Sequence, residues 1–261
     1  MVETITLIGG HGKNGAPEPV QRIDMNMGDV VSIVGPTGSG KTTLINDIEL
    51  FADGNTPTGR RLLIDGKRPP AAYRYNPSSN PIALITQHTN FLSDLSVIEF
   101  LKIHAGIRCD SNAKVSELVQ QTIDFANQLT GEPIIETNTM TELSGGQTRA
   151  MLIADATIVC NTPIVLLDEV ENAGINRTRA LELLRQHRKI FIFVTHDPRI
   201  ALLSDYRIVL ENGCITKLLV TNEEEKKCAV TVSRWDDMYT ALREKIRLGN
   251  QLQLQDVGGL A

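Results

Sequence analysis

The sequence has few cysteines, and none of them forms a pair with the spacing of a metal or redox motif. Cys109, Cys160, Cys214 and Cys228 are scattered along the chain. Without a C-x-x-C pair, the sequence offers no zinc-finger or thiol-redox spacing. We therefore expect four reduced thiols, as is usual in a reducing compartment.

Long hydrophobic runs are also missing. The longest apolar runs, at 164–167 and 190–194, have only the length of strands, whereas a membrane-spanning helix needs about 20 largely apolar residues. The N-terminus has no basic segment ahead of an apolar stretch, so no signal peptide is expected. Any work at a membrane is expected to depend on a separate membrane-spanning chain.

The chain lacks an excess of positive charge. Its 26 Lys and Arg are outnumbered by 31 Asp and Glu, which gives a net charge of −5. This balance argues against direct binding of nucleic acid, because nucleic-acid-binding domains are usually basic. Gly (20) and Pro (11) are at ordinary levels, which excludes collagen-like chains. With 41% hydrophobic residues among 261, the chain can form a sizeable core, as one large domain or two small ones.

Short apolar runs alternate with amphipathic segments along most of the chain. This alternation predicts an α/β fold with a mostly parallel sheet covered on both faces. Strands are expected at 4–8 (as an edge strand), 30–34, 82–86, 164–167 and 190–195. Asn212-Gly213 is a strong turn signal and predicts a hairpin of 206–210 with 214–220. No strand is expected between about 92 and 133, where helical spacing indicates an inserted helical segment.

One segment has the sequence of a phosphate-binding loop. Residues 35–42 read Gly-Pro-Thr-Gly-Ser-Gly-Lys-Thr and match the pattern G-x-x-x-x-G-K-[ST]. An expected strand precedes it and an expected helix at 41–51 follows it, which argues against an ordinary glycine-rich turn. Glycines let successive backbone N–H groups face an anion, and the helix N-terminus adds partial positive charge. Lys41 can reach the β- and γ-phosphates, and the Thr42 hydroxyl can bind Mg²⁺.

An acidic pair follows a second buried strand. Asp168 and Glu169 come directly after the apolar run 164–167. Two acids after a strand are weak evidence alone, because strands commonly end in polar residues. Together with the phosphate-binding loop, they predict that Asp168 holds Mg²⁺ and that Glu169 polarises the attacking water.

Three further motifs resemble those of ATP-binding cassette (ABC) ATPases. Residues 143–147 read Leu-Ser-Gly-Gly-Gln and resemble the signature of that family. Gln87 follows the expected strand 82–86, as the Q-loop glutamine does, and His196 follows the strand 190–195, as the switch histidine does. All five motifs occur in the order of the family, and the resemblance covers roughly residues 3–220.

The resemblance implies a fold and an assembly. The fold is a P-loop NTPase of ABC type, with a RecA-like core, an antiparallel β part and an α-helical subdomain inserted at about 90–160, together forming an ABC ATPase domain of residues 1–221. The extension 222–261 is expected to be helical, capped by Ser233 with Asp236, and packed on the core. The assembly is a head-to-tail homodimer, with ATP held between the phosphate-binding loop of one subunit and the signature of the other.

The resemblance also implies a role for each motif, with ATP and Mg²⁺ as cofactors. Lys41, His196 and the general base Glu169 are catalytic, and Thr42, Gln87 and Asp168 bind Mg²⁺. The signature residues that act on the partner's ATP are Ser144, Gly145, Gly146 and Gln147. The nucleotide-binding residues are Gly35, Pro36, Thr37, Gly38, Ser39, Gly40, Lys41, Thr42 and Thr43. The histidines that lie in no motif are interpreted as ordinary side chains: His88, His104 and His187.

Two places depart from the family pattern. The family often reads Pro-Thr-Ser-Ala-Leu-Asp after the catalytic Glu, whereas residues 170–175 read Val-Glu-Asn-Ala-Gly-Ile and are followed by Asn176. Ile175 thus stands at the D-loop aspartate position, and Glu171 adds a charge able to raise the pKa of a neighbouring carboxyl group. No aromatic residue stands where the family stacks one on adenine, and His11 is the nearest candidate.

The use of the ATP is open between two functions. Segment 89–107, with Phe91, Leu92 and Phe100, is similar to the region of transporter cassettes that docks a membrane subunit. This favours a cassette subunit on the cytoplasmic face of a membrane, which dimerises on ATP and drives a transporter's membrane subunits. The alternative for these side chains is that they close the helical lobe. The alternative function of the chain is that of a soluble ABC ATPase that remodels a protein, nucleic-acid or cofactor assembly.

Overall fold

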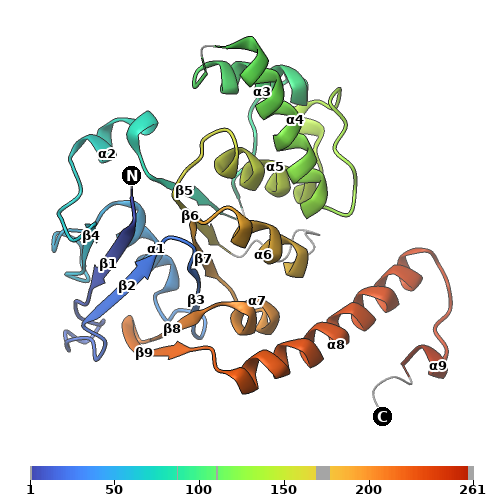
Figure 1. Cartoon of the computed structure of the whole chain (residues 1–261). Coiled ribbons are helices and arrows are strands. Elements are labelled where there is room, and N and C mark those ends of the chain that lie inside the picture. The colour runs from blue at the N-terminus through green and yellow to red at the C-terminus, as the bar shows by residue number, and fades with distance from the viewer. Residues whose placement is uncertain (1, 87, 110, 169–176, 258–261) are drawn as a thin grey trace.

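The computed structural model describes residues 2–86, 88–109, 111–168 and 177–257. A six-stranded sheet forms its centre, in the order β5-β6-β7-β3-β8-β9 (Figure 1). Its strands are β3 (Val30–Val34), β5 (Ile82–Ile85), β6 (Ile164–Asp168), β7 (Ile190–Val194), β8 (Tyr206–Glu211) and β9 (Cys214–Val220). All pairs are parallel except β8 with β9, which form an antiparallel hairpin as the Asn-Gly turn predicts. The α/β prediction is therefore confirmed.

The central strands separate two hydrophobic cores, because alternate side chains of a strand point to opposite faces. Leu166 of β6 and Ile192 of β7 face one core, which they share with the helix α1 (Lys41–Glu49). Val165 and Phe191 face the other core, which contains side chains of the helical elements. Burial on both faces explains why these strands are almost wholly apolar.

A second, three-stranded sheet has the order β2-β1-β4 and is antiparallel throughout. It consists of β1 (Thr4–Ile8), β2 (Arg22–Asn26) and β4 (Arg61–Ile64). The expectation that 4–8 forms an edge strand is wrong, since β1 is the central strand and pairs on both sides. Its two partners are short: β2 alternates polar and apolar residues over five positions, and β4 has only four residues, three of them apolar. Neither is distinctive by itself. The turns that follow include α2 (Ala72–Tyr75) and η1 (Pro77–Ser79).

The expected helical insertion lies between β5 and β6. It contains α3 (Val97–Gly106), α4 (Asn112–Leu129), η2 (Met140–Glu142) and α5 (Gly145–Thr157). Ser96 and Glu99 form a capping box that fixes the start of α3. The insertion stands beside the sheet as a separate lobe, joined to it through β5, α5 and α6 (Arg177–Gln186) (Figure 1).

The extension after β9 is helical but differs in detail from the expectation. Helix α8 (Glu223–Arg247) begins at the capping box of Asn222 with Glu225, so Ser233 lies inside the helix and does not cap it. Helix α8 contacts α7 (Pro198–Leu203) as far as its middle, where Arg199 forms an ion pair with Asp236. Trp235 lies in the extension that is expected to pack on the core, but it is 48% exposed.

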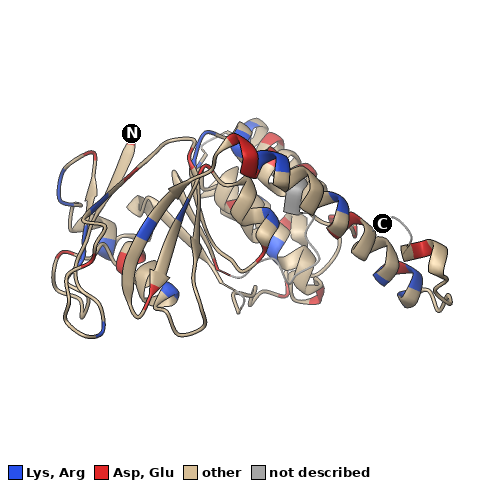
Figure 2. Ribbon diagram, turned by 90° about the horizontal axis from the view of Figure 1, so that it is seen from below, with Lys and Arg blue, Asp and Glu red and all other residues tan. Residues whose placement is uncertain are grey.

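The second half of α8 leads away from the body of the molecule and ends near α9 (Leu254–Val257) (Figure 2). Its Tyr239 and Ile246 are more than half exposed. The extension therefore rests on the core only over its first half. Among the described residues, no helix has the length and apolar character needed to cross a membrane.

Candidate nucleotide-binding site

The phosphate-binding loop joins β3 to α1, and its glycines are required by its geometry. Gly35 has a φ of 155°, and a Cβ atom there would lie 2.3 Å from the carbonyl oxygen of Leu210. Gly40 has a φ of 101° and stands at the N-cap of α1 without a side-chain hydrogen bond. The N-terminal N–H groups of α1 therefore have no side-chain cap, which suits the binding of an anion.

Lys41, the first residue of α1, folds back into this loop. Its side chain is buried, and Nζ donates to the carbonyl oxygens of Gly35 at 2.9 Å and Pro36 at 3.1 Å. A second lysine reaches the loop from the β1–β2 connection, where Lys13 Nζ donates to the Gly38 carbonyl at 2.8 Å. Two ammonium groups thus lie at one loop, and Lys13 was not among the predicted site residues.

A cavity of about 440 Å³ opens over this loop. The carboxyl ends of β3, β6 and β7 meet there, because these strands are neighbours in the sheet and Val194 pairs with both Ile33 and Asp168. Ligand sites of parallel sheets commonly lie at such an edge. The predicted site residues that line the cavity are Thr37, Gly38, Gly40, Lys41, Thr42, Thr43, Asp168 and His196. The phosphate-binding loop, Asp168 and His196 therefore converge in space, although they lie far apart in the sequence.

Some predicted residues cannot be placed in this cavity. Gln87 and Glu169 lie outside the described residues, as does the segment 170–176 that departs from the family pattern. His88, which was interpreted from the sequence as ordinary, lines the cavity and is exposed. His88 directly follows the predicted site residue Gln87, and this position could have indicated that His88 lies at the site.

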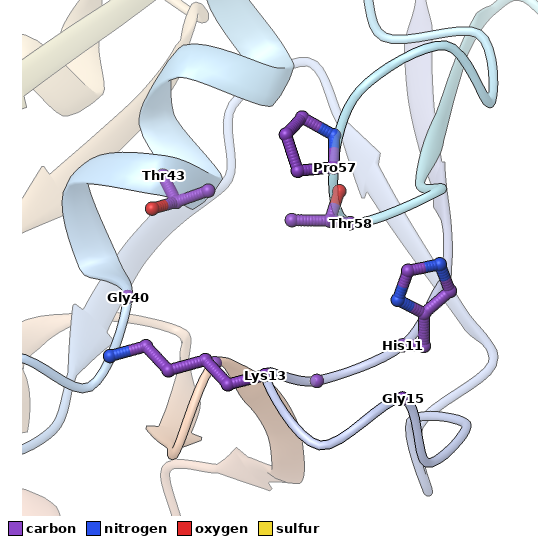
Figure 3. Close-up of a pocket in the computed structure, with 9 residues that line it drawn as sticks. His11, Lys13, Gly15, Gly40, Thr43, Pro57 and Thr58 are labelled. Carbon is purple, nitrogen blue, oxygen red and sulfur yellow. The ribbon is translucent and has the colours of Figure 1, made fainter.

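A second cavity, also of about 440 Å³, adjoins the first and shares Lys13, Gly40 and Thr43 with it. Figure 3 shows His11, Pro57 and Thr58 together on one side of this cavity, with Gly40 and Thr43 facing them from the other side. The loops of His11 and Thr58 are joined, since the His11 backbone N–H donates to the Thr58 carbonyl at 2.8 Å. The His11 ring lies against Gly59, whose added Cβ atom would be 3.1 Å from Nε2. This arrangement leaves an imidazole beside the cavity, where the family pattern would place an aromatic side chain.

A buried ion network holds the walls of this second cavity together. Arg60 is fully buried, and its guanidinium donates to Glu18 at 2.6 Å and to Asp47 at 3.0 Å. The Thr58 hydroxyl donates to Asp47 at 2.8 Å, and Arg60 also donates to the Gly213 carbonyl at 2.9 Å. Breaking a buried pair costs about 3–5 kcal/mol, since it leaves a buried charge without a partner. The network therefore fixes the relative positions of loops that are distant in sequence.

The signature residues lie elsewhere, at the N-terminus of α5. Ser144 Oγ accepts a hydrogen bond from the Gln147 backbone N–H, while the Gln147 side chain accepts from the Ser144 N–H at 2.9 Å. Gln147 Nε2 also donates to the Pro133 carbonyl at 3.0 Å. Ser144 and Gly145 are exposed, and residues 144–147 line neither described cavity. Within one chain, the structure does not bring the signature to the phosphate-binding loop.

Comparison with known proteins agrees with this arrangement. The family model described as ABC transporter matches residues 21–172. An uncharacterised ABC transporter ATP-binding protein of Methanocaldococcus jannaschii is 45% identical over 98% of this chain and 97% of its own. The chain belongs to the ABC transporter ATP-binding family. It is an ABC-type ATPase, as the phosphate-binding loop and signature predict.

More distant members of this family include the thiamine import ATP-binding protein ThiQ of Mesorhizobium japonicum, which is 30% identical over 72% of each chain. Among solved structures, an ATP-binding cassette dimer bound to ADP and phosphate has a TM-score of 0.64 at 22% identity and is covered over 99% of its length, against 84% of this chain. An ADP-bound cassette of an ABC transporter has a TM-score of 0.60 and covers 89% of this chain. These similarities establish the fold of the ABC ATPase domain.

The residues of this cassette fit a nucleotide's phosphates. The Ser39 hydroxyl is buried and has no hydrogen-bond partner in the described part of the chain. Such a group is costly to bury unless something else bonds to it. Phosphate oxygens bound at the uncapped N-terminus of α1 would supply that partner.

Proposed function

We propose that the chain is the nucleotide-binding subunit of an ABC transporter. It binds ATP with Mg²⁺, forms a head-to-tail dimer and drives separate membrane-spanning subunits. The observation that carries the proposal is the convergence of the ends of β3, β6 and β7 on one cavity over an uncapped helix N-terminus. The adjoining cavity beside His11 has the position and size to take a nucleoside.

Each residue at the cavity has a distinct role in this proposal. Lys41 binds the β- and γ-phosphates, and the glycine loop donates backbone N–H groups to the same oxygens. Thr42 and Asp168, together with Gln87, would hold Mg²⁺, which would supply positive charge to the phosphates. Glu169 accepts a proton from the attacking water, and His196 contacts the γ-phosphate. Lys13 is an additional cation at the phosphate end of the nucleoside cavity.

In the proposed dimer, the signature of one subunit completes the nucleotide site of the other. Ser144 and the N-terminus of α5 form a second anion site, which is exposed and lines neither cavity of its own chain. In a two-fold symmetric dimer, the signature of each subunit faces the phosphate-binding loop of the other, which gives two equal composite sites. Such a dimer places the γ-phosphate between two helix N-termini.

The helical lobe supports the role in transport. Leu92 is 98% exposed, and the aromatic rings of Phe91 and Phe100 lie edge to face beside it, 5.1 Å apart. On α3, Ile103 is 57% exposed, and Ile107 just beyond its end is 73% exposed. Exposed apolar side chains grouped on one lobe are typical of a protein interface, and we assign this surface to a membrane-spanning partner.

A pull-down from detergent-solubilised native membranes tests the transporter role. The full chain carries the tag, and the experiment is run with and without Mg·ATP. We expect a multi-spanning membrane protein in stoichiometric amount. A Leu92→Asp variant should lose this partner and keep ATPase activity, because Leu92 lies away from both cavities. Recovery of soluble partners alone would instead favour an ATPase that remodels a soluble assembly.

A further inference from the structure

Three side chains with metal-binding chemistry meet on the helical lobe. His104 lies on α3, Asp155 lies near the end of α5, and Cys160 follows α5. His104 Nδ1 is 2.8 Å from Asp155 Oδ1, and Cys160 Sγ is 3.6 Å from Asp155 Oδ2 and 3.9 Å from His104 Nε2. One ligand atom from each residue lies within 4.8 Å of the other two. Sequence spacing does not reveal this group, because His104 and Asp155 are 51 positions apart.

The surrounding structure holds the three side chains in place. The backbone N–H of Cys160 donates to the Asp155 carbonyl at 2.8 Å, so these two residues share one turn. The Phe100 ring packs 5.9 Å from the His104 ring and restricts its orientation. Ala105 and Ala154, the neighbours of His104 and Asp155 in the sequence, are fully buried. The donor atoms are therefore positioned by packed helices and do not depend on a surface loop.

The distances between these atoms suit a tetrahedral ion. With metal–ligand bonds of about 2.0–2.3 Å, two ligand atoms of a tetrahedral zinc site lie roughly 3.3–3.8 Å apart. The distance of 3.6 Å from Cys160 Sγ to Asp155 Oδ2 lies in this range. An imidazole binds an ion through one of its two nitrogens. The chosen nitrogen of His104 lies within 4.8 Å of the other two ligand atoms, and Nε2 is 3.9 Å from the sulfur. With Nδ1 as the ligand nitrogen, its separation of 2.8 Å from Asp155 Oδ1 has to lengthen by about half an ångström, as the ion replaces the shared proton.

The chemistry of the group selects one class of cation. Thiolate and imidazole ligands favour zinc and similar transition metals, whereas Mg²⁺ and Ca²⁺ prefer oxygen ligands alone. The His104 side chain is 26% exposed and that of Asp155 is 13% exposed, so an ion and a water molecule have access. The positive charge of Lys189 interacts electrostatically with Cys160. Its ammonium group donates hydrogen bonds to Asn161 Oδ1 and to the Thr162 carbonyl.

We propose that His104, Asp155 and Cys160 bind a thiophilic divalent metal ion of the zinc class, with water as the fourth ligand. Binding releases the thiol proton of Cys160 and the proton that His104 shares with Asp155 to solvent. The ion links α3 to the end of α5 that lies opposite the signature. This site is separate from the Mg²⁺ that accompanies ATP and does not depend on it.

Cobalt titration tests the site directly. Untagged full chain, freed of metal with a chelator and free of nucleotide, is titrated with Co²⁺. We expect one equivalent to produce a thiolate-to-cobalt charge-transfer band, and Zn²⁺ to displace it. Cys160→Ser should abolish the band, while His104→Gln and Asp155→Asn should weaken binding by about 10–100-fold or more. Cys109→Ser and Cys228→Ser, which alter thiols outside the group, should leave it unchanged.

Two further measurements distinguish a metal site from a group that is only hydrogen-bonded. Lys41→Ala, which disables the phosphate-binding loop, should leave the cobalt band intact. Zn²⁺ should raise the melting temperature of the parent chain but not that of Cys160→Ser. If Cys160→Ser does not fold, the spectrum of His104→Gln decides the matter. A folded parent chain without a charge-transfer band, or a band that survives in Cys160→Ser, would show that the three residues form only a structural hydrogen-bonded group.

Discussion

The N-termini of α1 and α5, which both contain glycine, differ in whether a side chain caps their free backbone N–H groups. At α1, Gly40 offers no side-chain cap, and Lys41 is buried in the loop beside it. At α5, Ser144 and Gln147 cap each other, and the end of the helix is exposed. The first terminus is therefore built to hold an anion within its own chain. The second is capped by its own side chains, and in the proposed dimer it meets an anion bound to the other subunit.

The largest expected effect comes from removing the cation at the first terminus. Lys41→Ala should reduce ATP hydrolysis by at least about 100-fold, comparable to the loss of one electrostatic donor at a reacting centre. Nucleotide binding by calorimetry and phosphate release measure the two parts. Near-normal turnover would show that α1 is not the catalytic terminus, whereas Ser144→Ala should leave nucleotide binding by the separate subunit intact.

The next effect tests whether the two termini meet. Glu169→Gln removes the proposed general base, which typically contributes about 10²–10⁴-fold to a rate. We expect turnover to fall accordingly and the variant to elute as a dimer with Mg·ATP in size-exclusion chromatography. The same variant with Mg·ADP should elute as a monomer. A monomer in both nucleotides would contradict a dimer closed by ATP.

A mixture of variants sharpens the comparison further. Lys41→Ala disables the first terminus, and Ser144→Arg places a bulky cation at the second. Each variant alone should be inactive, but an equal mixture should recover about a quarter of the parent activity, because half of the dimers then hold one intact composite site. Unmixed samples of each variant are the controls. No recovery in a mixture that still forms dimers would argue against sites shared between subunits.

The smallest expected effect concerns the pKa of His104, which lies beside the end of α5 opposite the signature. In the metal-free chain, the hydrogen bonds with Asp155 and Cys160 raise the pKa of His104 to about 10. The raised pKa of His104 adds to the stability of the folded chain. This stabilisation is fully present at pH values below about 6.5, the pKa of His104 in the unfolded chain, and disappears as the pH rises through 10. Asp155→Asn should lower the pKa of His104 toward the ordinary value in an NMR titration. His187, whose pKa is lowered mainly by burial, serves as the internal reference.

Local patterns predicted most of the fold correctly, and the structure brings several of the predicted site residues to one cavity. Non-local pairing accounts for what the sequence did not predict. The strand–loop–helix at 30–49 depends on a buried strand and glycines that are adjacent in the sequence, so it could be predicted. The position of β1 in its sheet depends on β2 and β4, which are short and weakly patterned. The start of α8 was missed because the charged run after Asn222 resembles a solvated loop.

Side chains that reach a site across long sequence separations were also missed. Lys13 meets Gly38 from a loop 25 positions away, and no motif contains both. His104 lies on α3, whereas Asp155 and Cys160 lie together at the end of α5, so the group forms only when α3 packs beside that end. Sequence spacing describes neighbours along one helix or strand, whereas these groups depend on how elements pack.

The burial of Arg60 between Glu18 and Asp47 has a consequence for the behaviour of the cassette on heating. The loop from 9 to 18 is rich in glycine, and it is tied to the rest of the molecule through charges that are fully withdrawn from water. The penalty for desolvating charged groups falls as the temperature rises. The wall of the nucleoside cavity should therefore keep its shape on heating better than loops held by exposed hydrogen bonds, and heat should loosen the far half of α8 before it opens the cavity.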